Sequence, residues 1–276
     1  MPEAPVALSV RDVLGEAVAA LRAAGVDTPE LDGELLLAHA LGVSRGRLLM
    51  EHDRPVTEEA LAGFRGLLAR RVAREPVAYI LGAKHFRWIE LAVDARVLIP
   101  RPETELLVEV ALAFPSGARV VDVGTGSGAV ALALAFERPD LEVCGTDVSE
   151  DAIEVARENA KRLGLGVGFS HCDLLDGVPG AVDAVLANLP YVADGTPLEP
   201  EILRYEPAQA LFAGVDGLDV IRRLVAAAAS ASIGLVALEI GPGQAQPVVQ
   251  LLAARGYRTE VYRDLAGHER VLVARL

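Results

Sequence analysis

The strongest constraint on how this chain folds is a pattern from residue 100 to residue 276, where short apolar segments alternate with helical ones. Alternating strands and helices predict a largely parallel sheet that is covered by helices on both faces. In such sheets, ligands bind at the carboxyl ends of the strands. The strand-like segments are residues 119–123, 141–146, 167–171, 181–187 and 235–240, followed by an expected antiparallel pair at 257–263 and 270–276.

Residues 1–78 carry helical patterns only, which predicts a small N-terminal bundle. Ser9 precedes one apolar periodic run, Thr28-Pro29 begins a second, residues 44–50 form a short third, and Thr57 precedes a fourth. Residues 79–99 alternate loosely and predict a hairpin linker, with strands near 85–93 and 96–99. In the second helix we expect four buried side chains: Leu31, Leu35, Leu36 and Ala38.

A glycine-rich loop joins the first strand of the alternating pattern to its helix, and it contains Asp122, Gly124, Thr125, Gly126, Ser127 and Gly128. Glycine permits positive φ and lets a ligand approach the backbone closely. Gly124, Gly126 and Ala129 also satisfy the G-x-G-x-x-A dinucleotide fingerprint. Asp147 follows the next strand, where an acid can accept both ribose hydroxyls of a nucleoside. The loop therefore predicts a nucleoside cofactor without choosing one.

The acidic residues near this loop favour a cationic cofactor. NAD carries a pyrophosphate, which prefers a helix N-terminus without acids, whereas S-adenosylmethionine carries an ammonium and a sulfonium. Asp122 suits the second cofactor, although it could instead hold only the loop's own amides. Asp173 follows the third strand, where it could meet the adenine amino group or belong to a plain turn. We expect S-adenosylmethionine, with NAD as the alternative.

The fourth strand ends in Asn188-Leu189-Pro190-Tyr191. This segment resembles the N-P-P-Y signature of methyltransferases that act on planar NH2 groups of glutamine or adenine. An amide nitrogen is a poor nucleophile, so an enzyme must hold both of its N–H groups and align it with the methyl group. The Asn188 side-chain oxygen and the residue 189 carbonyl can accept those N–H groups, and Tyr191 can stack on the amide. Leu189 departs from the family's proline, but it still supplies a carbonyl; a simple turn is the other interpretation.

With these residues together, the chain resembles the bacterial peptide chain release factor glutamine N5-methyltransferases over nearly its full length. The segments that carry the resemblance are residues 99–105, the glycine loop, 205–207 with 210–211, 214–218, 239–241 with Gln244, and 264–267 with Arg270.

The resemblance implies an α/β fold: a Rossmann-like, seven-stranded methyltransferase domain at residues 100–276, an N-terminal helical substrate-recognition domain at 1–78 and a β-hairpin linker at 79–99. It implies methyl transfer from S-adenosylmethionine to the glutamine of the GGQ motif in class 1 release factors, with S-adenosylhomocysteine as the product. By matching position, substrate contacts fall on residues 188–191, and cofactor contacts fall on Gly124 to Gly128, Asp147, Leu174 and Asn188.

Composition bounds the alternatives. The net charge is −13, with 14 basic and 25 acidic residues after residue 98, which argues against nucleic acid as a partner because such binding depends on cationic contacts to phosphates. Two cysteines, no signal peptide and no long apolar span predict a cytoplasmic protein outside the membrane. No histidine has metal-ligand spacing, so we expect no metal, and we expect a monomer.

Three alternatives remain beside release-factor methylation: a ribosomal-protein glutamine or adenine as acceptor, a nicotinamide oxidoreductase, and a non-catalytic adaptor of the same fold. Four arginines of the N-terminal bundle could either meet acidic surface on a partner or face solvent: Arg65, Arg70, Arg71 and Arg74.

Overall fold

The computed structural model describes residues 8–276, which form two compact units. The helical unit contains the described residues up to Gly82 together with Glu199–Tyr205, and the sheet unit contains Ala83–Leu198 and Glu206–Leu276. Residues 1–7 of the predicted first domain lie outside the described residues. The domain boundaries at 78 and 99 stay predictions, and the inclusion of residues 199–205 in the helical unit had no sequence signal.

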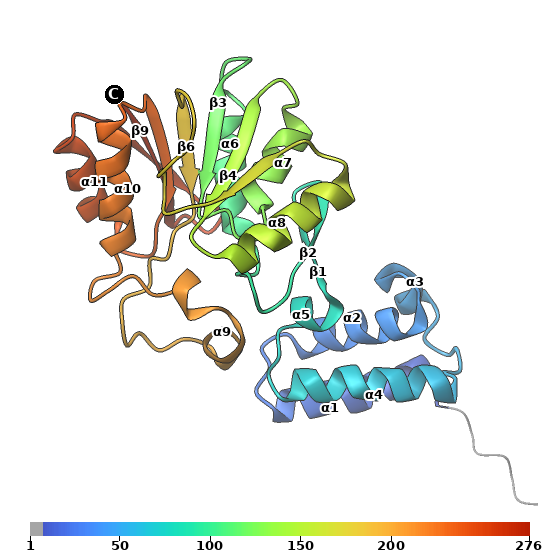
Figure 1. Ribbon diagram of the computed structural model, residues 1–276. Helices are drawn as coiled ribbons and strands as arrows, with labels where there is room; N and C mark the ends of the chain where they lie inside the picture. Colours follow the sequence, from blue (N-terminus) through green and yellow to red (C-terminus); the bar gives the residue numbers. More distant parts are fainter. Residues whose placement is uncertain (1–7) are drawn as a thin grey trace, which may run out of the picture. The chain divides into compact units, whose positions relative to one another are not determined.

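Serine and threonine caps start three helices of the helical unit. Ser9 and Asp12 form a capping box at the first helix, and the Ser44 and Thr57 side chains accept backbone N–H groups at the third and fourth. These helices are drawn in Figure 1: α1 (Val10–Ala23), α2 (Pro29–Leu41), α3 (Arg45–Met50), α4 (Glu58–Val72), α5 (Val77–Leu81) and α9 (Pro200–Tyr205).

The expected buried face of α2 was partly wrong. Leu31 is 39% exposed, Leu35 is half-buried, and Leu37 is buried although it was not expected to be. The buried stripe of α2 passes through residues 29, 32, 33, 36 and 37, a spacing of three and four that follows the helical period. Leu31 lies outside this stripe.

A buried ion cluster lies inside the helical unit. Arg71 Nε is 2.6 Å from Asp32 Oδ2, and Arg71 donates from its terminal nitrogen to Glu201 Oε1 at 2.9 Å. Arg74 pairs with the same Glu201, and Arg70 pairs with Glu75. Three of the four arginines considered for a partner surface are therefore engaged within this unit.

The hairpin at the start of the sheet unit is shorter than predicted. β1 (Ala83–Phe86) pairs antiparallel with β2 (Ile89–Ala92), and residues 96–99 form no strand. Asp94 accepts the backbone N–H and the guanidinium of Arg96, which closes a turn there. The Ile99 N–H donates to the buried Glu206 carboxylate at 3.0 Å rather than to a strand neighbour.

The central sheet has seven strands in the order β5-β4-β3-β6-β7-β9-β8, which confirms the predicted α/β class. The first five are parallel, and β9 runs antiparallel to both β7 and β8. The chain leaves β3 toward β4 and later returns on its other side with β6, so strand order reverses at β3. The bounds are β3 (Arg119–Val123), β4 (Glu142–Asp147), β5 (Gly168–His171), β6 (Ala184–Ala187), β7 (Leu235–Glu239), β8 (Arg258–Arg263) and β9 (Glu269–Arg275).

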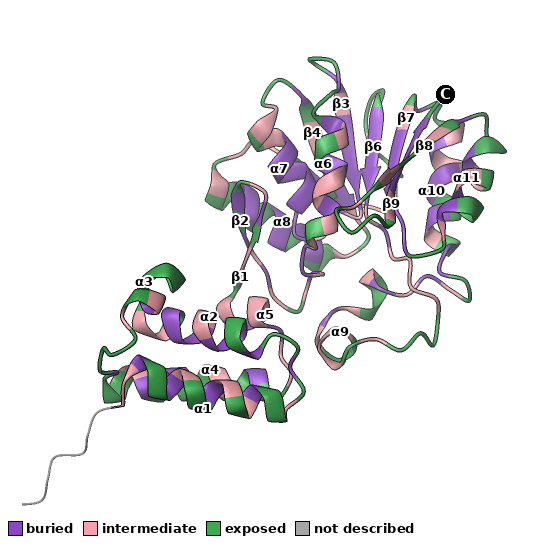
Figure 2. Ribbon diagram, turned by 180° about the vertical axis from the view of Figure 1, so that it is seen from behind, coloured by how far each residue is buried: buried purple, intermediate pink, exposed green. Residues whose placement is uncertain are grey.

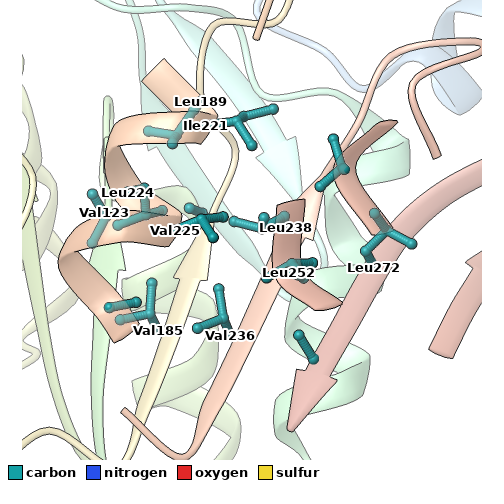
Figure 3. Packing of buried hydrophobic residues seen from close by; sticks show 14 of the residues in the cluster. Val123, Val185, Leu189, Ile221, Leu224, Val225, Val236, Leu238, Leu252 and Leu272 are labelled. Carbon is teal, nitrogen blue, oxygen red and sulfur yellow. The ribbon is translucent and has the colours of Figure 1, made fainter. Parts of the chain in front are cut away.

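Helices pack on both faces of this sheet. α10 (Asp219–Ser230) and α11 (Ala245–Ala253) share one apolar cluster with alternate residues of β3, β6, β7 and β9, as Figure 3 shows. α7 (Ala129–Glu137) contacts β3 on the other face, where Ala131 N–H reaches Asp122, and α6 (Glu105–Ala111) packs on α7. α8 (Glu150–Leu163) contacts β4 and β5. Strands β3, β6, β7 and β9 are largely buried (Figure 2), whereas the edge strands β5 and β8 are mostly exposed or half-buried.

Within residues 8–276, no helix combines the length and apolarity that crossing a membrane requires.

Candidate active site

A partly open cavity with about 760 Å³ of empty space lies in the sheet unit beyond the carboxyl ends of β3, β4 and β6. This is the edge at which strand order reverses, where open α/β sheets bind ligands. Eight predicted site residues line it: Asp122, Gly124, Thr125, Gly126, Ser127, Asp147, Asn188 and Pro190. The structure therefore brings the glycine loop, the acid after β4 and the motif after β6 to one cavity.

The glycine loop needs glycine because its backbone takes positive φ, and at two positions also because neighbouring side chains lie close. Gly124 and Gly126 have φ of 72° and 55°, a region that L side chains rarely adopt. A Cβ on Gly124 would lie 3.0 Å from Leu189 Cδ2, so the two strand-end loops are in close contact. Gly128 does not line the cavity; it too has a positive φ, of 82°, and a Cβ there would also meet Leu132 Cδ1 at 2.9 Å.

Asp122 holds the loop together. Its Oδ2 accepts from Thr125 Oγ1 at 2.6 Å and from Ala131 N–H at 3.2 Å. Burial raises the pKa of Asp122 to about 7, while these two hydrogen bonds oppose that rise. Asp122 is also one of the residues that line the cavity, so fastening the loop and placing negative charge near a cation are compatible roles.

Asp147 lies at the cavity with spare acceptor capacity. Its Oδ2 accepts from Gly126 N–H and its Oδ1 from Ser149 N–H, both at 2.9 Å. A carboxylate has about four lone-pair positions, so each oxygen can accept one further hydrogen bond. Burial raises the pKa of Asp147, and two hydroxyl donors would lower it again. Two acids beside a glycine loop fit a nucleoside that also carries positive charge.

Asn188 enters the cavity wall from the end of β6. Its Nδ2 lies 2.9 Å from Thr104 Oγ1, which leaves its Oδ1 as an acceptor. Thr104, at the end of the short 3₁₀ helix η1 (Pro102–Thr104), also lines the cavity. The segment 99–105 carries the family resemblance, but the sequence alone assigns Thr104 no role.

Leu189 turns away from the cavity. It is 4% exposed and belongs to the apolar cluster beneath α10, where Figure 3 shows it beside Ile221. The family's proline is replaced here by a side chain that packs into the core. This position can therefore offer an acceptor only through its backbone carbonyl.

Tyr191 is anchored behind the wall. Its hydroxyl lies 3.4 Å from Glu239 Oε1, its carbonyl accepts from Gln244 Nε2 at 2.9 Å, and its ring packs near Gly241. Burial raises the pKa of Tyr191 to about 12. The ring is not part of the cavity lining, so stacking on an acceptor amide stays a prediction.

Two further predicted cofactor residues do not line this cavity: Asp173 and Leu174. Asp173 pairs with Arg223, and Leu174, with φ of 52°, uses its carbonyl to accept from Thr146 Oγ1 at 2.8 Å. The lining residues that the sequence did not single out as site residues include Val97, Ser149, Pro207, Gln209 and Ala210. The segments around residues 99–105 and 205–211 were the available signal for several of them.

Among residues 8–276, no group of three or more His, Cys, Asp or Glu side chains could hold a metal ion.

Comparisons with known proteins place the chain in a family. The model of the PrmC N-terminal domain matches residues 12–82, and that of the methyltransferase small domain matches residues 102–204. The catalytic domain of human Mettl16, solved with an RNA hairpin of the MAT2A 3′UTR, superposes with a TM-score of 0.56 at 16% identity, covering 76% of this chain and 80% of that one. This last likeness shows the fold alone.

Sequence relatives are much closer. Release factor glutamine methyltransferase of Deinococcus radiodurans is 42% identical over 97% of this chain and 99% of its own length. That of Rhodospirillum rubrum is 44% identical over 92% of this chain and 81% of its own length. The chain therefore belongs to the release factor glutamine methyltransferase family.

Proposed function

We propose that this protein transfers a methyl group from S-adenosylmethionine to the side-chain amide nitrogen of the GGQ glutamine in class 1 peptide chain release factors. The observation that carries the proposal is the direction of the Asn188 amide. Its nitrogen is held by Thr104, and its oxygen is left as an acceptor in the wall of the cavity that Asp147 also lines. An acceptor amide and a nucleoside cofactor would meet in this cavity. The family's relatives support the choice of acceptor.

The chain's residues fit the cofactor. Asp147 would accept the ribose hydroxyls, the backbone of Gly124 and Gly126 would lie against the amino-acid portion, and Asp122 would add negative charge beside its cationic groups. The cofactor supplies an electrophilic methyl group whose bonding electrons remain on sulfur as the positive charge disappears. No metal is required by this chemistry, and we propose that none takes part.

The acceptor loop would orient the glutamine. Asn188 Oδ1 would accept one amide N–H and the Leu189 carbonyl the other, which favours the positive charge that grows on nitrogen. The nitrogen lone pair forms the new N–C bond, and the nitrogen then releases one proton to water. Holding the two reacting groups in line lowers the activation barrier further.

A labelled-methyl assay tests this function. Purified class 1 release factor, ribosomal proteins and DNA are offered in parallel, with a release factor whose GGQ glutamine is changed to glutamate as the control. We expect label only in the release factor that retains the GGQ glutamine, and mass spectrometry should place a single methyl group on that glutamine. Label confined to ribosomal protein or DNA would overturn the proposal and favour the alternative acceptors.

Two substitutions separate the two halves of the cavity. Asp147→Ala should weaken binding of S-adenosylhomocysteine by roughly 10- to 100-fold in calorimetry, the effect of losing charge-assisted hydrogen bonds. Asn188→Ala should lower kcat with cofactor affinity within about threefold, because its contact forms with the acceptor. Equal loss of both quantities in each variant would mean that the two roles are misassigned. A NAD titration should give no heat, and turnover by the wild type would remove the adaptor alternative.

We also propose a cytoplasmic monomer that binds no nucleic acid itself. Both cysteines are free and the chain is strongly acidic, as a reducing compartment and a protein partner would suit.

A further inference from the structure

A buried carboxyl group that the proposed chemistry does not use lies directly behind the acceptor loop. Glu239 ends β7, the strand beside β6, and is 1% exposed. Its Oε1 has a long contact of 3.4 Å with the Tyr191 hydroxyl, and its Oε2 makes no hydrogen bond of ordinary geometry with the described residues. A buried carboxyl this poorly satisfied costs stability, so its presence calls for a physical reason.

Four groups surround this carboxyl from three elements. Arg270 at β9 attracts it, but Arg270 already pairs with Asp264. Glu103 of η1 repels it, whereas two hydroxyl groups lower its pKa. The Tyr191 hydroxyl lies 3.4 Å from Oε1; the Thr104 hydroxyl acts from nearby without a hydrogen bond of ordinary geometry. Burial is the largest effect and raises the pKa of Glu239 to about 7.

Thr104 connects this carboxyl to the acceptor site. A hydroxyl has one proton to donate and can accept in return. If Thr104 donates toward an ionised Glu239, it must accept from Asn188, and the Asn188 amide then turns its Nδ2 to Thr104 as observed. A protonated or amide side chain at residue 239 could donate instead. The hydroxyl would then donate to Asn188, which would reverse the amide and present its NH2 to the acceptor.

We propose that Glu239 is a positioning residue that acts through Thr104 to fix which end of the Asn188 amide faces the acceptor glutamine. The proposal rests on the proposed function, since only an acceptor that donates N–H groups requires the oxygen end. An ionised carboxylate accepts hydrogen bonds and never donates, so it sets the direction of the whole chain of hydrogen bonds. The active form is therefore the ionised one.

The pH profile of kcat at saturating cofactor and release factor tests this role. The wild type should lose activity about tenfold per pH unit below a midpoint near 7. Glu239→Gln should lower kcat at pH 8 at least tenfold, leave KM for release factor within about threefold, and remove the acid limb. The pKa of Asp122 is also raised to about 7. The substitution that abolishes the fall of kcat at acid pH therefore identifies the carboxyl group responsible for it. The control is Glu137→Gln. Glu137 is the last residue of α7 and pairs with Arg87, so this variant should still lose activity at acid pH as the wild type does.

Thr104 provides a second pair of variants if Glu239→Gln fails to fold. Thr104→Val removes the hydroxyl at nearly constant shape, so the fall of kcat at acid pH should disappear. Thr104→Ser keeps a hydroxyl, so kcat should still fall at acid pH. A limb that survives in both Glu239→Gln and Thr104→Val would overturn the proposal.

A direct readout needs no turnover. In the cofactor-free wild type, the NMR signals of the Asn188 side-chain NH2 should shift with pH with a midpoint near 7, and in Glu239→Gln they should stay constant. If the chemical shifts of the Asn188 side-chain NH2 do not change with pH in the wild type, the proposal is overturned even when release factor is methylated. Failure of the wild type to methylate release factor, with the titration present, would instead overturn the proposed acceptor.

Discussion

Replacing Arg71 with methionine should destabilise the helical unit far more than removing an exposed arginine. Arg71 is 6% exposed and lies between the carboxylates of Asp32 and Glu201, which are themselves largely buried. Methionine keeps much of the volume but removes the charge. The two carboxylates would then be left in a poorly solvated position.

The expected magnitude follows from the partners that remain. Breaking a buried ion pair by removing one member costs about 3–5 kcal/mol. Thr28 would still donate to Asp32 at 3.0 Å, and Arg74 would still pair with Glu201. We therefore expect a loss near the lower end, about 3 kcal/mol, which corresponds to roughly 100-fold faster amide exchange in a unit that opens as a whole.

Hydrogen exchange measured by mass spectrometry on the intact protein isolates this unit. The readout is the exchange rate of amides in α2, α4 and α9. The matched control is Arg47→Met, since Arg47 is paired with Glu51 at 2.8 Å but its side chain is 61% exposed. An exposed pair of this spacing contributes about 0.3–0.5 kcal/mol, so exchange should rise less than about threefold.

Equal exchange in the two variants would refute the reasoning, because burial would then add nothing to the ion pair. Adding Asp32→Asn to Arg71→Met should recover part of the loss by removing one of the stranded charges. A double variant that exchanges faster than Arg71→Met would contradict the same argument.

Two further predictions concern the sheet unit. Burial raises the pKa of Asp122 from 3.8 to about 7. The carboxyl group therefore loses its proton near pH 4 in the unfolded chain and near pH 7 in the folded protein. Raising the pH from 4 to 7 should lower the free energy of unfolding by at most about 4 kcal/mol. The unfolding free energy in urea of Asp122→Asn minus that of the wild type should rise across this window, and a constant difference would contradict the assignment. Leu189→Ala should lower the unfolding free energy by about 2–4 kcal/mol, since it empties a buried site, whereas Leu265→Ala, at a fully exposed position, should change it by less than about 0.5 kcal/mol; similar values would mean that Leu189 does not pack as described.

Much of the fold was predictable because it depends on neighbours in the chain. Ser9, Ser44 and Thr57 mark helix starts through hydrogen bonds to residues three positions later. The alternation after residue 100 required a covered parallel sheet, and the glycines of the loop marked a close backbone approach. Local patterns of this kind are readable without knowing which segments meet.

The predictions that failed depend on contacts between distant segments. The alternation near residues 96–99 resembled a strand, but the Ile99 N–H donates to Glu206, 107 positions away, and not to a strand neighbour. The sequence predicts that Arg71 faces solvent or a partner, but Arg71 instead pairs with Glu201, 130 positions away. Neither partner can be inferred from sequence spacing.

The sequence by itself determined the class of fold and located the glycine loop and the motif at residues 188–191, because each depends on residues that are close together along the chain. Only the tertiary structure decided that Leu189 belongs to the core, that Thr104 lies beside Asn188, and that Glu239 lies behind Tyr191. Thr104, the motif at residues 188–191 and Glu239 lie on segments far apart in the chain. The order of strands in the sheet brings them together, and burial then gives the carboxyl among them its unusual proton affinity.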